Sequence, residues 1–131
     1  MTLDVRDLLA PGTPGKTPLP LAPDVVFHSP VADYSGRDDV AHLFLTIGQC
    51  LTVIEPIQEF TEDGGRNSVT TFNAKVGEES AYGVFVQQLG ADGDLTEAML
   101  LLRPLSTLRT AVALMGEALT ADPLPSRRRP R

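Results

Sequence analysis

The side chains that can transfer protons near neutral pH are few in this sequence and lie far apart. They are the two histidines, His28 and His42, of which His42 is expected at the surface. His28 is followed directly by Ser29 at the end of a strand-forming run. A histidine acts as an acid or base within hydrogen-bond reach of a substrate, and a serine needs such a base before its hydroxyl can attack. His28 and Ser29 are therefore the candidate catalytic residues.

Strand alternation separates these two candidates. Phe27 is apolar and is expected to point into the core, so Ser29 shares its face while His28 points outward. Ser29 is thus the stronger candidate for a polar group inside the fold. The alternative is that its hydroxyl bonds only to nearby backbone.

Other catalytic chemistries find little support in the sequence. Two distant histidines and one cysteine fall short of the three or four ligands of a usual zinc site, so we expect no metal. There is no glycine-rich phosphate loop and no nucleophile elbow, and we expect no cofactor. Glu55 and Glu59 are a carboxylate pair, but solvated charges on an edge strand explain them more simply.

The composition indicates one globular domain. The chain has 131 residues, of which 42% are hydrophobic. No apolar run approaches the ~20 residues of a membrane span, and the first residues lack the pattern of a signal peptide. Cys50 is the single cysteine, which excludes an internal disulfide and fits a reducing compartment. We therefore expect a cytoplasmic protein with no membrane partner.

The net charge of −6 hides an asymmetry. Four of the eleven basic residues are Arg127, Arg128, Arg129 and Arg131, and the rest of the chain has 7 basic against 17 acidic residues. An acidic body lacks the clustered cations that phosphate contacts need, so no nucleic-acid partner is expected. We interpret residues 121–131 as a disordered basic tail.

The stretch 24–47 predicts a strand, a turn and a helix. Val25, Val26 and Phe27 favour a strand, which Pro30 ends. A helix is expected from residue 37 to about residue 51, because apolar residues recur there at i, i+3, i+4 and i+7. These are Val40, Leu43, Phe44 and Ile47.

Four further strands and a last helix are predicted after residue 51. Alternation and turn signals place the strands at 52–62, 66–76, 80–89 and 94–103. Pro56 assigns the first of them to a sheet edge or a bulge. The helix follows Pro104, with an apolar stripe from Leu105 to Leu119.

The first 23 residues are predicted to form a proline-rich arm. A short helix is expected from Leu3 to Leu9, and the prolines that follow prevent a long one. The arm should pack through Leu19 and Leu21. The predicted fold class is α+β, an antiparallel sheet with helices segregated to one face.

The order of these motifs resembles the SnoaL-like branch of the nuclear transport factor 2-like superfamily. The resemblance spans about residues 22–120. We take residues 24–120 as the domain. The matching features are the run Val25–Val31, Gly36-Arg37 before a helix, the hairpin Leu89–Gly93, the strand Glu97–Leu102, and Arg103–Ser106 before the last helix.

The resemblance implies a strongly curved antiparallel sheet wrapped around helices, a cystatin-like cone with an apolar pocket inside. Its members include ketosteroid isomerase, small polyketide cyclases, epoxide hydrolases and non-catalytic binders. The fold thus leaves the chemistry open.

This chain departs from the family pattern in three places. Ser29 stands where the isomerases carry their general-base Asp. Gly83 is followed by Val84 and Phe85, where relatives carry a second acid. The proline-rich arm replaces the long first helix. The isomerase mechanism is therefore not expected to carry over.

The predicted pocket is apolar with three polar groups. Tyr34 either lies over its mouth or packs on the surface, as loop tyrosines commonly do. Gln87, if buried, must find a hydrogen-bond partner such as a ligand. The alternative for Gln87 is a place at the sheet edge. The predicted lining is Phe27, Ser29, Tyr34, Phe44, Phe72, Phe85, Gln87, Ala98, Leu100 and Leu102.

Two functional hypotheses follow. The leading one is binding of an apolar small molecule, with polyketide cyclase-like or isomerase-like activity as one form of it. The other is a non-enzymatic interaction module with a filled pocket that forms a homodimer through the outer sheet face. The predicted outer positions are Thr71, Asn73, Lys75, Val84, Val86, Met99 and Leu101, the last four of them apolar. A solvent-open cavity of ~300 Å³ or more that holds at least one polar group favours the first hypothesis. A pocket plugged by Phe72, Phe85 and the arm favours the second.

Overall fold

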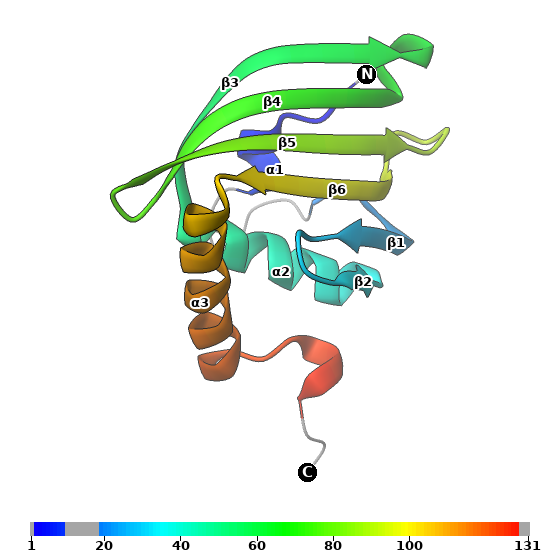
Figure 1. Ribbon diagram of the computed structural model, residues 1–131. Helices are drawn as coiled ribbons and strands as arrows, with labels where there is room; N and C mark the ends of the chain where they lie inside the picture. Colours follow the sequence, from blue (N-terminus) through cyan, green and yellow to red (C-terminus); the bar gives the residue numbers. More distant parts are fainter. Residues whose placement is uncertain (1, 10–18, 129–131) are drawn as a thin grey trace.

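The computed structural model describes residues 2–9 and 19–128 (Figure 1). Its elements are α1 (Val5–Leu8), β1 (Leu21–His28), β2 (Asp33–Ser35), α2 (Arg37–Cys50), β3 (Leu51–Glu62), η1 (Asp63–Gly65), β4 (Asn67–Val76), β5 (Glu79–Leu89), β6 (Leu95–Arg103), α3 (Leu105–Ala121) and η2 (Pro125–Arg127). None of the helices in these residues is long and apolar enough to cross a membrane.

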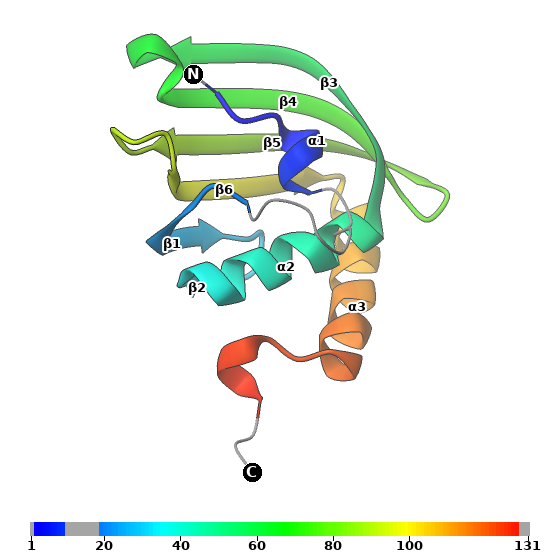
Figure 2. The ribbon, with the colours of Figure 1, turned by 180° about the vertical axis from the view of Figure 1, so that it is seen from behind.

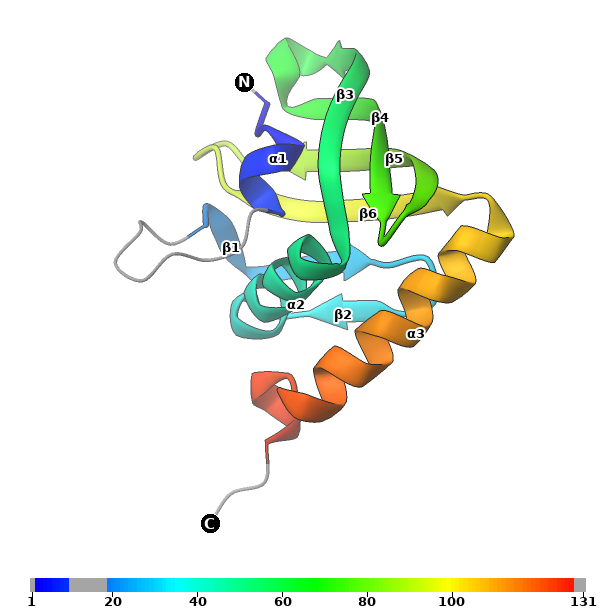
Figure 3. The same cartoon turned by 90° about the vertical axis from the view of Figure 1, so that its left-hand side faces the viewer.

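The six strands form one open sheet in the order β2-β1-β6-β5-β4-β3. Figures 1 and 3 show the sheet bending around α1 and α2, while α3 leaves the end of β6 and runs away from the sheet. The predicted α+β class and the curved sheet are confirmed. The purely antiparallel prediction is wrong at one pair, because β1 and β6 are parallel. A long crossover joins these two strands, so no hairpin turn dictates their relative direction.

The helix α2 buries its apolar stripe against the concave face of the sheet. Val40, Leu43, Phe44 and Ile47 are at most 6% exposed. The ring of Phe44 contacts Phe27 edge-on at 4.9 Å between centroids and Phe85 at 6.2 Å. Such edge-to-face pairs stabilise a core beyond the area that they bury. Together with Phe72, these rings are fully buried and fill the middle of the cone.

The strand β3 lies at the sheet edge, as Pro56 predicted. Its register with β4 shifts between Thr52 and Glu55 and again between Pro56 and Gln58. These irregularities absorb the proline, which has no N–H to donate to a neighbouring strand. Glu55 and Glu59 are both exposed here.

Both ends of the described chain are more ordered than the sequence predicted. The sheet begins at Leu21, inside the predicted arm of residues 1–23. In the tail predicted to be disordered from residue 121, η2 is packed on α2. Leu124 is 3% exposed, and the Ser126 N–H donates to Asp39 Oδ1 at 3.0 Å. The buried side chain of Leu124 anchors this segment, which the basic composition of the tail did not predict.

Gly83 leaves room for the end of the Phe72 ring. It pairs directly with Phe72 across β4 and β5, and a Cβ at Gly83 would overlap the Phe72 ring. We therefore expect Gly83→Ala to lower the free energy of unfolding by about 1–3 kcal/mol, measured by urea denaturation, because an overpacked core must shift.

Gly116 in α3 is the matched control for this substitution. A Cβ there meets no atom within 4 Å, so Gly116→Ala should leave the stability unchanged or raise it by up to about 1 kcal/mol. If Gly83→Ala were as stable as the parent, the Phe72 contact would not constrain this position.

Candidate functional site

An apolar groove opens to solvent between α2, α3 and the end of β6, and we call it the α2–α3 groove. Its volume is about 210 Å³, which is below the ~300 Å³ expected for a ligand-binding cavity. The helix α3 forms one wall with six residues, and the turn between β1 and β2 forms the rim. The lining residues are Ser29, Pro30, Val31, Tyr34, Leu43, Ile47, Cys50, Leu51, Leu100, Leu102, Leu108, Ala111, Val112, Met115, Gly116 and Leu119.

No charged side chain is among these lining residues. Their polar side-chain atoms are the hydroxyls of Ser29 and Tyr34 and the thiol of Cys50. Burial raises the pKa of the Cys50 thiol, which therefore stays protonated and uncharged near neutral pH. The groove thus suits an uncharged ligand, because an ionised group would lose its hydration without gaining a partner.

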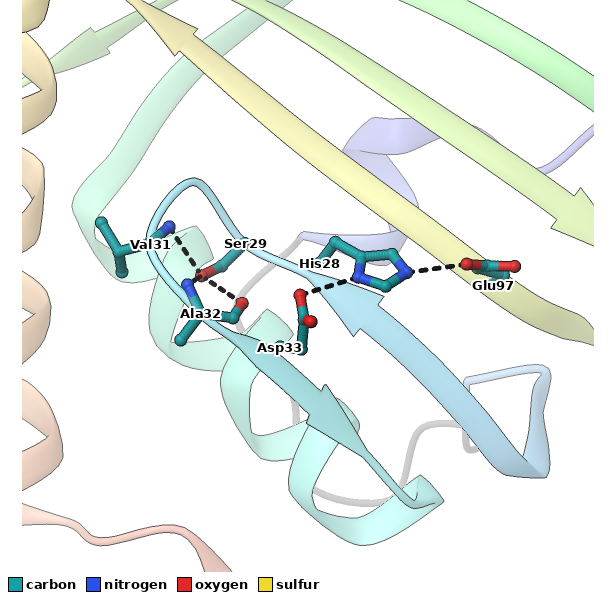
Figure 4. A network of polar contacts seen from close by, with 6 residues as sticks. All are labelled: His28, Ser29, Val31, Ala32, Asp33 and Glu97. Atoms are coloured by element: carbon teal, nitrogen blue, oxygen red, sulfur yellow. Dashed lines mark hydrogen bonds and ion pairs between the residues drawn. The ribbon is translucent and has the colours of Figure 1, made fainter.

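The Ser29 hydroxyl reaches the rim of the groove, but the turn uses it fully (Figure 4). Its Oγ accepts from the Ala32 N–H at 3.0 Å and the Val31 N–H at 3.3 Å, and it donates to the Ala32 carbonyl at 2.9 Å. This is the local backbone bonding considered as the alternative for this residue. In this arrangement Ser29 shapes the turn and contacts no general base.

His28 points away from the groove, toward the outer face of the sheet (Figure 4). Its Nδ1 lies 2.7 Å from Asp33 Oδ1, and its Nε2 lies 2.7 Å from Glu97 Oε2. The hydrogen bond to Asp33 raises the pKa of the imidazole most, and the hydrogen bond to Glu97 raises it further. A protonated His28 donates from both ring nitrogens and ties β1 to β2 on one side and to β6 on the other.

The predicted pocket residues fall into two groups. Ser29, Tyr34, Leu100 and Leu102 line the groove. The other six do not line it, which corrects the sequence prediction, because the aromatic rings pack against one another in the middle of the cone. These six are Phe27, Phe44, Phe72, Phe85, Gln87 and Ala98, all of them at most 2% exposed.

Gln87 has found a partner within the chain. Its Nε2 donates to the Leu3 carbonyl at 2.9 Å, and its Oε1 accepts from the Leu3 N–H at 3.0 Å. The buried amide is therefore satisfied by the N-terminal arm.

The α3 wall of the groove was not predicted as part of a site. The sequence feature that could have indicated this wall is the apolar stripe from Leu105 to Leu119. In the structure, most of this stripe is not buried. Among its 17 residues, Thr107 and Ala111 are buried. A helix with this much uncovered apolar surface indicates a groove or an interface.

No group of three or more His, Cys, Asp or Glu side chains in residues 2–9 and 19–128 is arranged to hold a metal ion.

Comparison with known proteins gives a clear answer at the level of structure. No protein-family model and no curated protein matches this sequence. A steroid delta-isomerase from Pseudomonas aeruginosa is similar, with a TM-score of 0.74 and 29% identity over 78% of this chain and 76% of its own. A protein with a cystatin-like fold from Silicibacter pomeroyi DSS-3 has a TM-score of 0.74 and 28% identity over 79% and 73% of the two chains.

A SnoaL-like protein of unknown function from Burkholderia thailandensis E264 has a TM-score of 0.53 and 12% identity over 65% of this chain and 76% of its own. Together with the curved sheet and the helix in its concave face, these similarities define the class. The chain has the fold of nuclear transport factor 2-like and SnoaL-like proteins. The resemblance seen in the sequence is confirmed.

The cluster of His28, Asp33 and Glu97 predicts a pH-dependent stability. The imidazole pKa of His28 is raised in the folded protein. Its contribution to the free energy of unfolding is therefore complete below about pH 6.5, which is the pKa of histidine in the unfolded chain. It is lost as the pH rises through the raised folded-state pKa. Urea denaturation should show the parent more stable than His28→Gln below about pH 6.5, with the difference shrinking at higher pH.

Glu97→Gln serves as the matched variant. This variant keeps the hydrogen bond to Asp33, which is the larger cause of the raised His28 pKa. Its stability should therefore retain part of the pH dependence. Parallel stability curves for the parent and His28→Gln across this pH range would show that the two ion pairs contribute nothing.

Proposed function

We propose that this protein binds an uncharged, hydrophobic small molecule in the α2–α3 groove. The observation that carries the proposal is the lining of the groove, which is apolar except for two hydroxyls and one protonated thiol. Concave apolar sites with a few polar groups are the usual form of small-molecule sites. The similarity to a steroid delta-isomerase supports this class of ligand.

The energetics favour a moderate affinity. Burying ~200 Å² of apolar ligand surface contributes ~5 kcal/mol at ~25 cal/mol per Å². Lost translational and rotational freedom opposes this gain. A ligand that also covers the exposed parts of Val112 and Val31 gains further area, since these side chains are 40% and 64% exposed.

Binding is better supported than proton transfer. No carboxylate or imidazole lines the groove. The Ser29 hydroxyl is engaged with Ala32, and Phe85 is packed in the core at the position of the second acid. An isomerisation or cyclisation in this groove would depend on its shape and on Tyr34.

Tyr34 is the polar group that a ligand can use. It lies in β2 at the groove and is partly buried. Its hydroxyl makes no hydrogen bond to any residue in the described part of the chain. A ligand with one carbonyl or hydroxyl oxygen at the end nearest β2 therefore matches the site, because the phenol can donate to that oxygen.

Gly116→Phe should block the groove. The added ring extends from the α3 wall, where a Cβ meets no atom within 4 Å. We expect at least about a tenfold loss of affinity for any uncharged steroid or aromatic polyketide that raises the melting temperature of the parent. A thermal-shift screen followed by calorimetric titration measures this.

Ala113→Phe is the control, because Ala113 lies in the same helix but is exposed and outside the groove. It should bind such ligands as the parent does. Equal losses in both variants, or no shift of the parent with any apolar ligand, would contradict the proposal.

Tyr34→Phe tests the polar contact. We expect about a tenfold weaker binding of a ketone-bearing ligand, the value of one hydrogen bond. The matching ligand without the oxygen should bind both proteins equally, as titration calorimetry can measure. Equal affinity of both proteins for the ketone would place the ligand oxygen elsewhere.

A second function, protein interaction through the outer sheet face, is favoured by a separate observation. The cone is filled by four phenylalanines and the arm, and the outer face exposes Tyr82, Met99 and Leu101 by 36%, 38% and 48%. In this alternative the partner is a second copy of the chain. A dimer in sedimentation that Met99→Lys and Leu101→Lys disrupt, together with no ligand-induced shift, would favour it over ligand binding.

A further inference from the structure

The concave face of the sheet is occupied in part by the N-terminal segment, residues 2–9. Figure 2 shows α1 of this segment lying against the concave side of the sheet, and Figure 3 shows it within the curve. Val5, Leu8 and Leu9 are 2%, 2% and 1% exposed. The α2–α3 groove has none of these residues in its lining.

The sheet holds this segment through its main chain. Gln87 is fully buried, and its amide both donates to the carbonyl and accepts from the N–H of Leu3. Thr2 Oγ1 donates to the Gly65 carbonyl at 3.0 Å. A side-chain amide that pairs with both groups of one residue imitates an added strand, and it recognises a peptide backbone whatever the side chain.

The site offers more hydrogen bonding than the segment uses. Ser68 lies directly opposite Gln87 in the β4–β5 register, so the two side chains share the concave face. Ser68 is 3% exposed, and its Oγ has no hydrogen-bond partner among the described residues. A hollow of about 520 Å³ adjoins the segment and is walled by Pro56, Glu59, Thr61 and Thr70 as well.

The segment depends on these contacts for its conformation. Its helix α1 has four residues, and a single turn is unstable in isolation because nucleation costs more than one hydrogen bond returns. The segment therefore resembles a bound peptide that belongs to the same chain as its binding site.

We propose that the concave end of the sheet around Gln87 is a peptide-binding site that the chain fills with its own residues 2–9. It accepts in trans a peptide segment of the same chemistry. That segment presents a main-chain N–H and carbonyl to Gln87 and apolar side chains at the positions of Val5, Leu8 and Leu9. This site is separate from the α2–α3 groove and does not rest on the function proposed there.

The test uses the full chain with Val5→Asp, which places a charge in an apolar contact and releases the segment. The probe is a synthetic peptide copying residues 2–9, acetylated and amidated. We expect amide NMR spectra to show a folded body and a titration with this peptide. The parent should bind it at least about a hundredfold more weakly, because the tethered segment competes at high effective concentration.

Three controls accompany the titration. Adding Gln87→Leu to Val5→Asp should weaken binding about tenfold. Asp7→Ala, at an exposed position of the same segment, should behave as the parent, and a scrambled peptide should not bind. Hydrogen exchange on the parent should show lower protection for residues 5–9 than for β4 and β5, since the segment opens independently.

Three outcomes would overturn the proposal. The first is global unfolding of Val5→Asp, and the second is equal exchange protection of the segment and the sheet; each shows that the segment is inseparable from the core. The third is a folded Val5→Asp that does not bind the peptide. Failure of any apolar ligand to bind the α2–α3 groove would leave this proposal unaffected.

Discussion

The structure depends on the edge-to-face packing of Phe44 between Phe27 and Phe85. A curved sheet creates a concave face that must be filled, and α2 fills it by placing the ring of Phe44 between two strands. The filled centre divides the concave side into two ends. One end is closed by the N-terminal segment on Gln87, and the other opens as the α2–α3 groove.

Charge and apolar surface are separated across the sheet. His28 is clamped between Asp33 and Glu97 on the outer face, and the groove behind the same turn has no charged lining residue. The clamp joins the short strand β2 to the sheet through β1. It therefore ties the strand that carries Tyr34 to the sheet, although none of its three residues lines the groove.

Most elements followed from local patterns. Pro30 and Pro56 marked a strand end and a sheet edge, and the stripe at Val40 to Ile47 gave a helix within one residue of the observed end. Hydrophobic periodicity, turn-forming residues and prolines act over short stretches of the chain. They can therefore be recognised in the sequence without knowledge of the fold. The direction of β1 against β6 was missed because it is set by a crossover of many residues. The order of residues 121–128 was missed because one buried leucine outweighs a basic composition.

The site was decided by tertiary packing. The sequence showed that positions 29 and 85, where the resemblance implies acids in the isomerases, hold Ser29 and Phe85. Residue identity alone settles which groups can ionise. It could not show that the aromatic residues pack together rather than line a hollow, or that α3 provides a wall. Burial against a partner distant in the chain depends on the relative placement of helices and strands. For the same reason, the partner of Gln87 became visible only when Leu3, 84 residues away, was placed beside it.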